Sequence, residues 1–512
     1  MPTLTTLADL LLVGADDATA IHAPGAKPLS YRALRQQVAQ AVTTLNQLGI
    51  GRQDRVAIVL PNGPEMATAF ISVAAAACAA PLNPAYRADE FEFYLGDLHA
   101  KALIVEHGSQ SAALAVAAKL GIPVLELLPA DAGAGAFSLR ATAGAAAASA
   151  PTAAPASAPA ADDLALILHT SGTTSRPKIV PLTQANICAS AGNVGATLQL
   201  TARDIGLNIM PLFHIHGLIA GLLAPLAAGS TVFCTPGFNA LKFFAWMQEA
   251  RPTWYTAVPT MHQTIVARAA QNQAIIAAHP LRFLRSSSAS MPPQVIAELE
   301  SVFGAPLIEA YGMTEAAHQM ASNPLPPALR VPGSVGLAAG PQVAIMDQQG
   351  QLLPAGATGE IVIQGGNVTA GYENNPKANA EAYVGRWFRT GDQGVMDPQG
   401  YLRITGRLKE IISRGGEKIS PREVDEILMD HPAVQQVVTF GIPHDKLGED
   451  VGAAVVLHPG QAVSEKELRE FVAIRLADFK VPRKILFLDE IPKGATGKLQ
   501  RIGLAQKLGL AA

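Results

Sequence analysis

The chain alternates short apolar runs with longer helix-like stretches, and this alternation limits its fold more than any other feature. "RVAIVL", which begins at Arg55, is followed by "PNGPEMATAFISVAAAA". The same order returns in "STVFCT" before "ALKFFAWMQEA" and in "LRFLRS" before "PPQVIAELESVF". Short apolar strands separated by helices pair in parallel and are covered on both faces. The pattern therefore predicts an α/β fold built on parallel-sheet subdomains.

The length and the composition call for more than one domain. A chain of 512 residues that is 49% hydrophobic can bury a large core, and it is longer than a single domain usually is. At about residues 129–162 the composition changes to Ala, Pro, Ser and Gly, which cannot bury a core. We interpret that segment as a low-complexity surface linker inside the large domain.

The pattern changes again after about Gly340. Glycine-rich turns in "MDQQGQLLPAGATGEIVIQGG" and "DPQGYLRITGR" predict hairpins, and hence a small β-barrel-like part. "SPREVDEILMDHP" predicts a helix, with Ser420 as its N-cap and Glu423 completing a capping box. We place the domain boundary before this helix, between residues 406 and 407. Residues 1–406 form a large N-terminal domain, and residues 407–512 form a small C-terminal α/β domain.

The charge balance points to a small-molecule partner. The 38 basic and 41 acidic residues are scattered and leave a net charge of −3, so the chain has no basic field for nucleic acid. The longest apolar runs are alanine-rich, interrupted, and too short to span a bilayer. We expect neither nucleic-acid binding nor a membrane span, and the oligomeric state stays open.

The cysteines and the chain ends predict a cytoplasmic location. The three cysteines, Cys78, Cys188 and Cys234, are far apart in apolar or small-residue surroundings, which argues against a disulfide or metal role. The first residues carry no basic group ahead of their apolar run, unlike a secretory signal. The final "LGLAA" is not a peroxisomal address.

A loop of small and hydroxyl residues, from Thr170 to Lys178, follows the apolar run "LALILH". Its backbone N–H groups and hydroxyls, with the charge of Lys178, suit a triphosphate. It is not the usual P-loop, because Ile179 follows the lysine where Ser or Thr is needed. Taken alone, the loop could equally be a solvated Ser/Thr turn.

Four further motifs follow in order: "YGMTE" at 311–315, "TGD" at 390–392, "GRLKEIISRGGEKISP" at 406–421 and "PKGATGKLQR" at 492–501. Together with the loop, they resemble the adenylate-forming superfamily of acyl-CoA synthetases, luciferases and adenylation domains over almost the whole chain. The resemblance implies that a carboxylate attacks the α-phosphorus of ATP and that coenzyme A then displaces AMP, with Mg²⁺ as cofactor. Ser175 and Ile179 depart from the family, which often has glycine there.

The resemblance also implies a role for each matching residue in ATP binding. The β- and γ-phosphates are assigned to Thr170, Ser171, Gly172, Thr173, Thr174 and Lys178. The α-phosphate and Mg²⁺ are assigned to Thr314 and Glu315. The adenine slot is assigned to Glu309, Ala310, Tyr311 and Gly312, with the backbone of Ser288 and Ala289. The ribose is assigned to Asp392 with Arg407, and Lys498 is assigned to the α-phosphate and the substrate carboxylate.

For thioester formation, the resemblance implies that the small domain is mobile and turns about a hinge at Lys409. Gly415 and Gly416 match the loop that lines the pantetheine tunnel, where glycine allows a close backbone approach. Lys418 either serves thioester formation or is an ordinary surface charge.

The acyl site is expected to be polar. By the family pattern it is faced by His214, Ser288 and His318. A fatty-acyl tunnel would be apolar, since each buried polar group left unpaired costs roughly 1–3 kcal/mol. A second carboxylate on the substrate would pair with these groups, and we assign His318 to the carboxylate that is not activated. His214 and His216 are not expected to form a zinc site, because no third ligand stands at a suitable spacing.

The stretches "PLFHIHGL", "RSSSAS", "EAYGMTEAAH" and "SRGGEKISP" resemble the branch of the family that joins oxalate to coenzyme A. Malonate stays open, because Arg282 and Arg285 lie near the acyl segment, as do other short, medium-chain or aryl acids. His318 as a packing residue and a carrier-loading adenylation enzyme without CoA are further alternatives. A non-catalytic relative would be expected to lose Glu315, Asp392 or Lys498, and all of these are present.

Overall fold

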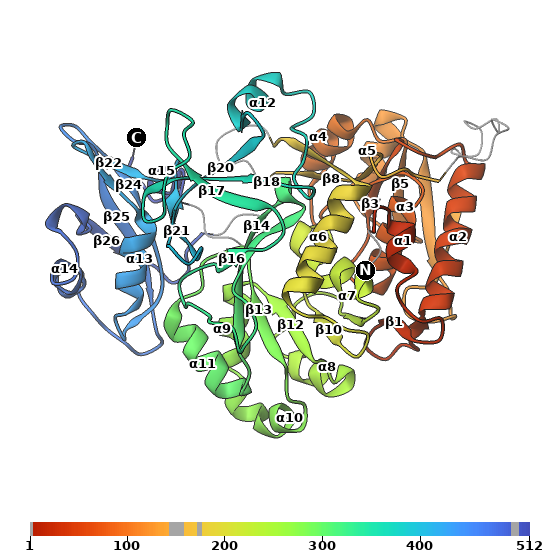
Figure 1. Ribbon diagram of the computed structural model, residues 1–512, viewed down its shortest axis with the longest axis horizontal. Coiled ribbons are helices and arrows are strands. Elements are labelled where there is room, and N and C mark those ends of the chain that lie inside the picture. Colours follow the sequence, from red (N-terminus) through yellow and green to blue (C-terminus); the bar gives the residue numbers. More distant parts are fainter. Residues whose placement is uncertain (1–3, 143–157, 171–176, 493–500, 512) are drawn as a thin grey trace. The chain divides into compact units, whose positions relative to one another are not determined.

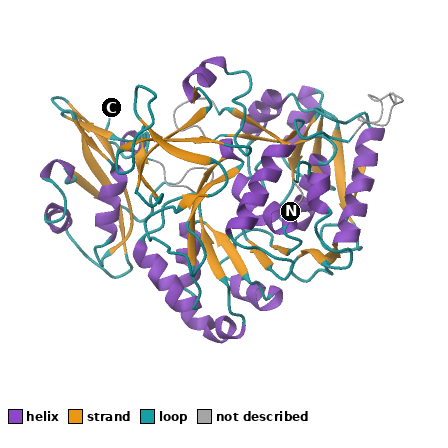
Figure 2. Cartoon of the chain, in the orientation of Figure 1, coloured by secondary structure: helices purple, strands orange, loops and turns teal. Residues whose placement is uncertain are grey.

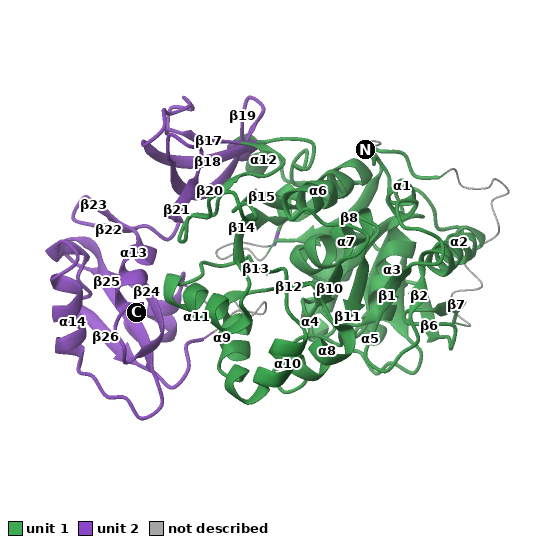
Figure 3. Cartoon of the chain, turned by 60° about the horizontal axis from the view of Figure 1, so that its bottom comes forward, with its two compact units in different colours: residues 1–170, 178–342, 364–380 green, residues 171–177, 343–363, 381–512 purple. Residues whose placement is uncertain are grey.

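The computed structural model describes residues 4–142, 158–170, 177–492 and 501–511. The chain divides into two compact units (Figure 3). Unit 1 comprises residues 1–170, 178–342 and 364–380, and unit 2 comprises residues 171–177, 343–363 and 381–512.

A seven-stranded sheet forms one half of unit 1, in the order β7-β6-β5-β3-β4-β8-β9 (Figure 1). Its central strands are parallel, and β7 and β9 are antiparallel edges. The strands are β3 (Arg55–Val59), β4 (Cys78–Pro81), β5 (Ala102–Glu106), β6 (Val124–Pro129), β7 (Phe137–Ala141), β8 (Leu164–His169) and β9 (Ile179–Thr183).

Helices cover this sheet, and they come from stretches before, between and after its strands that carry apolar residues. They are α2 (Tyr31–Gln47), α3 (Pro64–Ala74), α4 (Ala88–Leu98), α5 (Ala113–Leu120) and α6 (Gln184–Thr197). Proline at the first position starts α3, and its residues Met66 to Ala74 are all buried. The alternation predicted from "RVAIVL" onward is confirmed.

The second sheet of unit 1 has nine strands, in the order β16-β15-β14-β13-β12-β10-β11-β1-β2. It is parallel from β14 to β1, whereas β2, β15 and β16 are antiparallel. The strands are β1 (Thr19–His22), β2 (Leu29–Ser30), β10 (Ile205–Asn208), β11 (Thr231–Cys234), β12 (Trp254–Ala257), β13 (Phe283–Ser286), β14 (Leu307–Met313), β15 (His318–Ser322) and β16 (Leu337–Ala338).

Helical segments, purple in Figure 2, also accompany this second sheet. One of them, η1, is a π-helix. They are α1 (Leu7–Leu11), η1 (His216–Leu223), α7 (Ala224–Ala227), α8 (Phe243–Ala250), α9 (Pro259–Val266), η2 (Ala269–Asn272), α10 (Gln273–Ala278), α11 (Pro293–Phe303), η3 (Thr314–Ala316) and α12 (Pro376–Ala382). An apolar core that includes Phe243, Tyr255 and Leu299 packs around β10, β12 and β13.

Unit 2 contains two five-stranded sheets. The first holds β17 (Gln342–Met346), β18 (Thr358–Gln364), β19 (Tyr383–Val384), β20 (Trp387–Met396) and β21 (Leu402–Arg407). The second holds β22 (Ile412–Arg414), β23 (Glu417–Ile419), β24 (Val434–His444), β25 (Gly448–Leu457) and β26 (Lys484–Phe487). Its helical segments are α13 (Pro421–Met429), α14 (Glu465–Ala473), η4 (Asp478–Lys480) and α15 (Leu504–Lys507). The predicted α/β class is confirmed, and the boundary between residues 406 and 407 stays a prediction.

Two local expectations differ from the structure. Within the predicted linker, Phe137 starts the edge strand β7, because its backbone exchanges two hydrogen bonds with the buried Gln37 amide, at 2.8 and 3.2 Å. The predicted capping box of α13 does not form. The Ser420 hydroxyl donates to the carbonyl of Thr405, and Glu423 pairs with Lys480 at 2.7 Å. Among the described residues, no helix is long and apolar enough to cross a bilayer.

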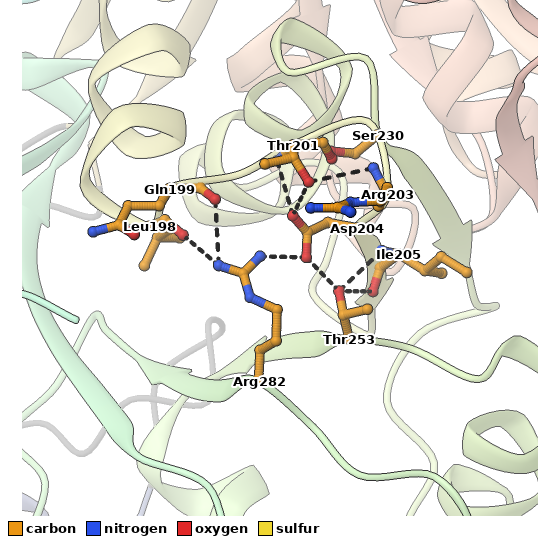
Figure 4. Close-up of polar contacts among 9 residues, drawn as sticks. All are labelled: Leu198, Gln199, Thr201, Arg203, Asp204, Ile205, Ser230, Thr253 and Arg282. Carbon is orange, nitrogen blue, oxygen red and sulfur yellow. Dashed lines mark hydrogen bonds and ion pairs between the residues drawn. The ribbon is translucent and has the colours of Figure 1, made fainter. Parts of the chain in front are cut away.

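A buried carboxylate forms hydrogen bonds with the segments that precede several strands of the second sheet. Asp204 precedes β10 and accepts hydrogen bonds from the Thr201 N–H at 2.8 Å, from the Thr253 hydroxyl at 2.8 Å, and from Arg282 (Figure 4). Arg282 also donates to two backbone carbonyls just beyond α6. Burial alone would raise the pKa of Asp204, but these donors together lower it. Arg282 is therefore a structural residue.

We expect Asp204→Asn to destabilise unit 1 only where the carboxylate would be ionised. Because the folded-state pKa is lowered, the contribution is present at neutral pH and is lost as the pH falls below the unfolded value of about 3.9. The substitution should lower the free energy of unfolding by roughly 1–2 kcal/mol at neutral pH. The loss should be smaller than for a fully buried ion pair, because the Arg282 side chain is partly exposed. Urea unfolding at about pH 7 and about pH 3 measures it.

Asp17→Asn is the matched control, because Asp17 meets Arg32 on the surface with its side chain 92% exposed. It should shift the urea midpoint little at either pH. An equal loss of stability for Asp204→Asn at both pH values would contradict the ionic account.

Candidate active site

A strained turn joins β14 to β15 and carries the residues expected at the α-phosphate, Thr314 and Glu315. The two strands pair in antiparallel fashion, with Gly312 opposite Gln319. A Cβ at Gly312 would lie 1.8 Å from the carbonyl oxygen of His318. His318 itself has φ of 102°, in the left-handed region that side chains rarely adopt. Gly312 is thus needed for the close approach that sets His318 in place.

Asn367 holds this turn from outside. Its side-chain Nδ2 donates to the carbonyls of Ala316 at 2.8 Å and Gln319 at 2.9 Å, which bracket His318. A strained backbone persists where its surroundings fix it in several ways. Asn367 was not among the expected site residues, and nothing in "GGNVTAGY" signals its role.

His318 belongs to a buried cluster with His216 and Arg285. The Arg285 guanidinium donates to Nε2 of His318 at 3.0 Å and to Nε2 of His216 at 3.3 Å. The two imidazole rings are stacked, with centroids 4.9 Å apart and planes 17° apart. All three side chains are buried: Arg285 and His216 are 0% exposed and His318 is 2% exposed.

Arg285 is a cation surrounded by neutral groups. Besides the imidazoles, its guanidinium donates to the Gln319 side-chain oxygen at 3.3 Å and to the Thr256 hydroxyl at 3.4 Å. Among the described residues, none of its partners is a carboxylate. Burial lowers the pKa of Arg285 to about 9, which still leaves it charged at neutral pH. An unpaired buried cation is costly and marks this cluster as a site for an anion.

The participation of His216 corrects the sequence analysis. His214 lies half-buried in the bend before η1, whereas His216 is the buried first residue of η1. His216 Nδ1 lies 3.1 Å from the Ser288 hydroxyl, and its Nε2 lies 2.7 Å from the Thr256 hydroxyl. Ser288 thereby joins the cluster, as expected for the acyl site. Only His214 of "HIH" was assigned to the acyl site, and nothing in these letters shows that a π-helix begins at His216.

A second network connects Glu315 to Lys178 through Tyr372. The Tyr372 hydroxyl donates to Oε1 of Glu315 at 2.8 Å, and the Lys178 ammonium lies 4.3 Å from the centre of the Tyr372 ring. The Thr369 N–H donates to the Glu315 backbone carbonyl at 2.8 Å. The structure thus brings together the lysine of the phosphate loop and the carboxylate expected at Mg²⁺. Tyr372 was not among the residues expected at the site.

The two ends of the phosphate loop are bonded to each other. The Thr170 N–H donates to the Lys178 carbonyl at 2.9 Å, and the Lys178 N–H donates to the Thr170 hydroxyl at 3.2 Å. The loop residues between them that were assigned to the phosphates, Ser171, Gly172, Thr173 and Thr174, lie outside the described residues.

The segments assigned to adenine meet on neighbouring strands. Glu309, Ala310 and Tyr311 lie on β14, and the Ser287 hydroxyl donates to the Ala310 carbonyl at 2.9 Å. Ser288 follows with φ of 75°, and the next residue, Ala289, is exposed. In unit 1, then, the predicted adenine segment leads directly into the predicted acyl segment.

In unit 2, Asp392 and Arg407 face each other on β20 and β21. The Arg407 Nε donates to Asp392 at 2.7 Å, so the expected ribose pair is oriented as a unit. Lys409 follows two residues after β21, at the predicted hinge.

The expected CoA loop also lies in unit 2. Gly415 and Gly416 have φ of 58° and 98°, and the Lys418 ammonium donates to the Ser413 hydroxyl at 2.7 Å. Lys498 lies outside the described residues.

Comparison with known families identifies the class of enzyme to which these sites belong. The profile of the AMP-binding enzymes matches residues 13–373, and that of the AMP-binding enzyme C-terminal domain matches residues 423–498. The chain belongs to the AMP-binding enzyme family. The expected adenylate-forming acyl-CoA synthetase, which uses ATP, Mg²⁺ and coenzyme A, is thereby confirmed.

Relatives within the family match nearly the full length. A probable CoA ligase, CCL9, of Humulus lupulus is 46% identical, over 98% of this chain and 95% of the relative. An oxalate–CoA ligase of Arabidopsis thaliana is 44% identical, over 96% and 95%. The crystal structure of ATP-bound MatB from Rhodopseudomonas palustris superposes with a TM-score of 0.87 at 29% identity, covering 99% of this chain and 98% of that one.

We expect Gly312→Ala to abolish activity and to destabilise unit 1, because the added Cβ would clash with backbone and not with a movable side chain. Overpacking of this kind costs about 1–3 kcal/mol or more. Urea unfolding and pyrophosphate release measure the two effects.

Gly192→Ala in α6 is the control, since a Cβ there meets nothing within 4 Å. It should be neutral or stabilising by up to about 1 kcal/mol. Full activity of Gly312→Ala would contradict the close approach.

Proposed function

We propose that the chain is an oxalate–CoA ligase, which converts oxalate, ATP and CoA into oxalyl-CoA, AMP and pyrophosphate. The observation that carries this proposal is the buried cluster of Arg285, His216 and His318, which holds positive charge and hydrogen-bond donors without a carboxylate among the described residues. A substrate with a second carboxylate would complete it. The 44% identity to an oxalate–CoA ligase supports the same substrate.

The energetics favour a dianionic substrate over an apolar one. Hydrogen bonds to charged groups contribute roughly 1.5–3 kcal/mol each. An apolar acyl chain would instead leave the buried charge of Arg285 without an anion. Because oxalate has no methylene spacer, its two carboxylates must sit close together, which suits a compact polar site better than a tunnel.

Adenylation in this proposal is a matter of position and charge. One oxalate carboxylate oxygen attacks the α-phosphorus of ATP, and the bond to the pyrophosphate oxygen breaks. Pyrophosphate leaves with the electron pair. Lys178 would balance charge on the departing phosphates, and Lys498 would hold the attacking carboxylate against the α-phosphate. Asp392, oriented by Arg407, would accept hydrogen bonds from the ribose hydroxyls.

Glu315 fits a Mg²⁺ ion because its carboxylate is a hard oxygen ligand that the Tyr372 hydroxyl already orients. The ion would supply positive charge to the phosphate oxygens. Tyr372 would keep Glu315 in one rotamer, and the same ring would hold the Lys178 ammonium nearby.

In the second half-reaction, the CoA thiol loses its proton to solvent, its sulfur attacks the oxalyl carbonyl, and AMP leaves as the carbon–oxygen bond of the anhydride breaks. We assign the pantetheine arm to the loop at Gly415 and Gly416, whose positive φ values suit glycine. Lys418 is a candidate for this half, and Lys409 for the hinge.

Malonate is the second candidate, and the burial of Arg285 in the cluster favours it. An arginine can pair with a carboxylate held one methylene further away. We also propose a cytoplasmic location, since Cys78, Cys188 and Cys234 are free thiols that suit a reducing compartment.

We predict that pyrophosphate release in the presence of CoA is fastest with oxalate in a panel of oxalate, malonate, acetate, octanoate and coumarate. His318→Ala should lower kcat/KM for oxalate by about 100-fold, because a buried charged hydrogen bond is lost, and should leave KM for ATP nearly unchanged. Faster turnover with malonate would support the second candidate. Preference for octanoate or coumarate, unaffected by the substitution, would overturn both.

Lys498→Ala should separate the two half-reactions. Adenylation should fall by about 100-fold or more, because a cation at the developing charge is lost, whereas AMP release from added oxalyl adenylate and CoA should change little. Lys466→Ala is the control in the same unit, since that lysine lies on the surface and makes a loose pair with Glu470, at 3.8 Å. Equal losses in both half-reactions would contradict the assignment of Lys498.

A further inference from the structure

We propose that Arg285 is a positioning residue that fixes the proton of both His216 and His318 on Nδ1. This role rests on the proposed function, because the fixed protons decide which N–H and O–H groups can donate to the substrate carboxylate. Its physical basis is the geometry of the cluster.

Arg285 constrains the imidazoles because a guanidinium can only donate hydrogen bonds. It approaches Nε2 of His318 at 3.0 Å and Nε2 of His216 at 3.3 Å. A ring nitrogen that accepts a hydrogen bond carries no proton, so in each neutral ring the proton must lie on Nδ1. The adjacent cation also opposes protonation of either ring.

For His318 the result is a single N–H donor on the side of the ring opposite Arg285. A neutral imidazole in water divides its proton between both nitrogens, so part of the population would offer an acceptor where a carboxylate needs a donor. Fixing the tautomer means that every His318 side chain presents the N–H donor before the substrate binds. A lone pair turned toward oxalate would repel it.

The fixed proton of His216 in turn orients the Ser288 hydroxyl. With the proton on Nδ1, His216 donates to the Ser288 oxygen across 3.1 Å. The Ser288 hydroxyl hydrogen must then point to another acceptor, and a substrate carboxylate in the proposed acyl site is such an acceptor. The Thr256 hydroxyl, 2.7 Å from the same Nε2, must then donate its hydrogen there, while its oxygen accepts from Arg285 at 3.4 Å. Arg285 thus sets two donors, one through each histidine.

His262 is an internal control, because its contacts fix the opposite tautomer. Its Nε2 lies 3.1 Å from the backbone carbonyl of Arg285, which only accepts, so its proton must lie on Nε2. Its Nδ1 accepts from the Tyr255 hydroxyl at 3.0 Å. The carbonyl stays in place when the Arg285 side chain is replaced, so this tautomer should not change.

The first experiment is ¹⁵N NMR of the full chain, labelled at histidine, at about pH 8 without substrate. The 12 histidines are resolved by long-range ¹H–¹⁵N correlations, and substitution of His216, His262 and His318 one at a time assigns their signals. We expect His216 and His318 as Nδ1–H tautomers and His262 as the Nε2–H tautomer. A proton on Nε2 of either His216 or His318 in the wild-type protein would overturn the proposal, and this measurement needs no Arg285 variant.

The second experiment is a double-mutant cycle with Arg285→Met and His318→Asn. An asparagine amide keeps an N–H donor near the position of Nδ1 and has no tautomer to fix. In the wild-type background, Arg285→Met should lower kcat/KM for oxalate by about 100-fold. In the His318→Asn background, the same substitution should lower it by about tenfold or less. Equal effects in both backgrounds would mean that Arg285 does not act through His318.

The two failures are distinguishable. If NMR gives the expected tautomers but His318→Ala leaves oxalate turnover intact, the proposed substrate contact is wrong. If His318→Ala abolishes oxalate turnover but the tautomers are mixed, the role of Arg285 is wrong. His262 reports on folding in each variant, because its Nε2–H signal should persist wherever the surrounding sheet is intact.

Discussion

A guanidinium buried without a carboxylate among the described residues is the constraint on which the rest of the acyl site depends. Arg285 lies on β13, and its partners come from β12, η1 and β15, so four separate elements must converge to satisfy its donors. Water cannot solvate a group with no exposed surface. The positive charge therefore calls for an anion, and its hydrogen bonds set how the neighbouring side chains can meet that anion.

The turn between β14 and β15 joins this acyl cluster to the phosphate chemistry. Glu315 and His318 are three residues apart, and Gly312 and Asn367 hold the strained backbone between them. Tyr372 then ties Glu315 to Lys178. In the proposed mechanism, one short stretch of chain thus sets both the metal ligand and the clamp for the second carboxylate, so the reacting carboxylate is fixed relative to the α-phosphate from two sides.

The α/β class and the order of the motifs were predictable because apolar periodicity and glycine-rich loops are local properties of the sequence. His318 was predictable for a related reason, as it stands out among alanines. His216 was missed because its place in the cluster depends on the π-helix η1, which the sequence does not reveal, and Arg285 and Arg282 could not be told apart by sequence. Asp204 captures Arg282, whereas Arg285 faces the imidazoles, and only tertiary packing decides this. The same holds for Asn367 and Tyr372, which lie far from their partners in the sequence.

The most direct test of the central claim compares oxalate with oxamate, in which an amide replaces one carboxylate at nearly the same size and shape. If the second carboxylate balances the buried charge, kcat/KM for oxalate should exceed that for oxamate by about 100-fold, and Arg285→Met should reduce this ratio below about tenfold. Equal use of the two substrates by the wild-type protein, or a ratio that survives the substitution, would contradict the account.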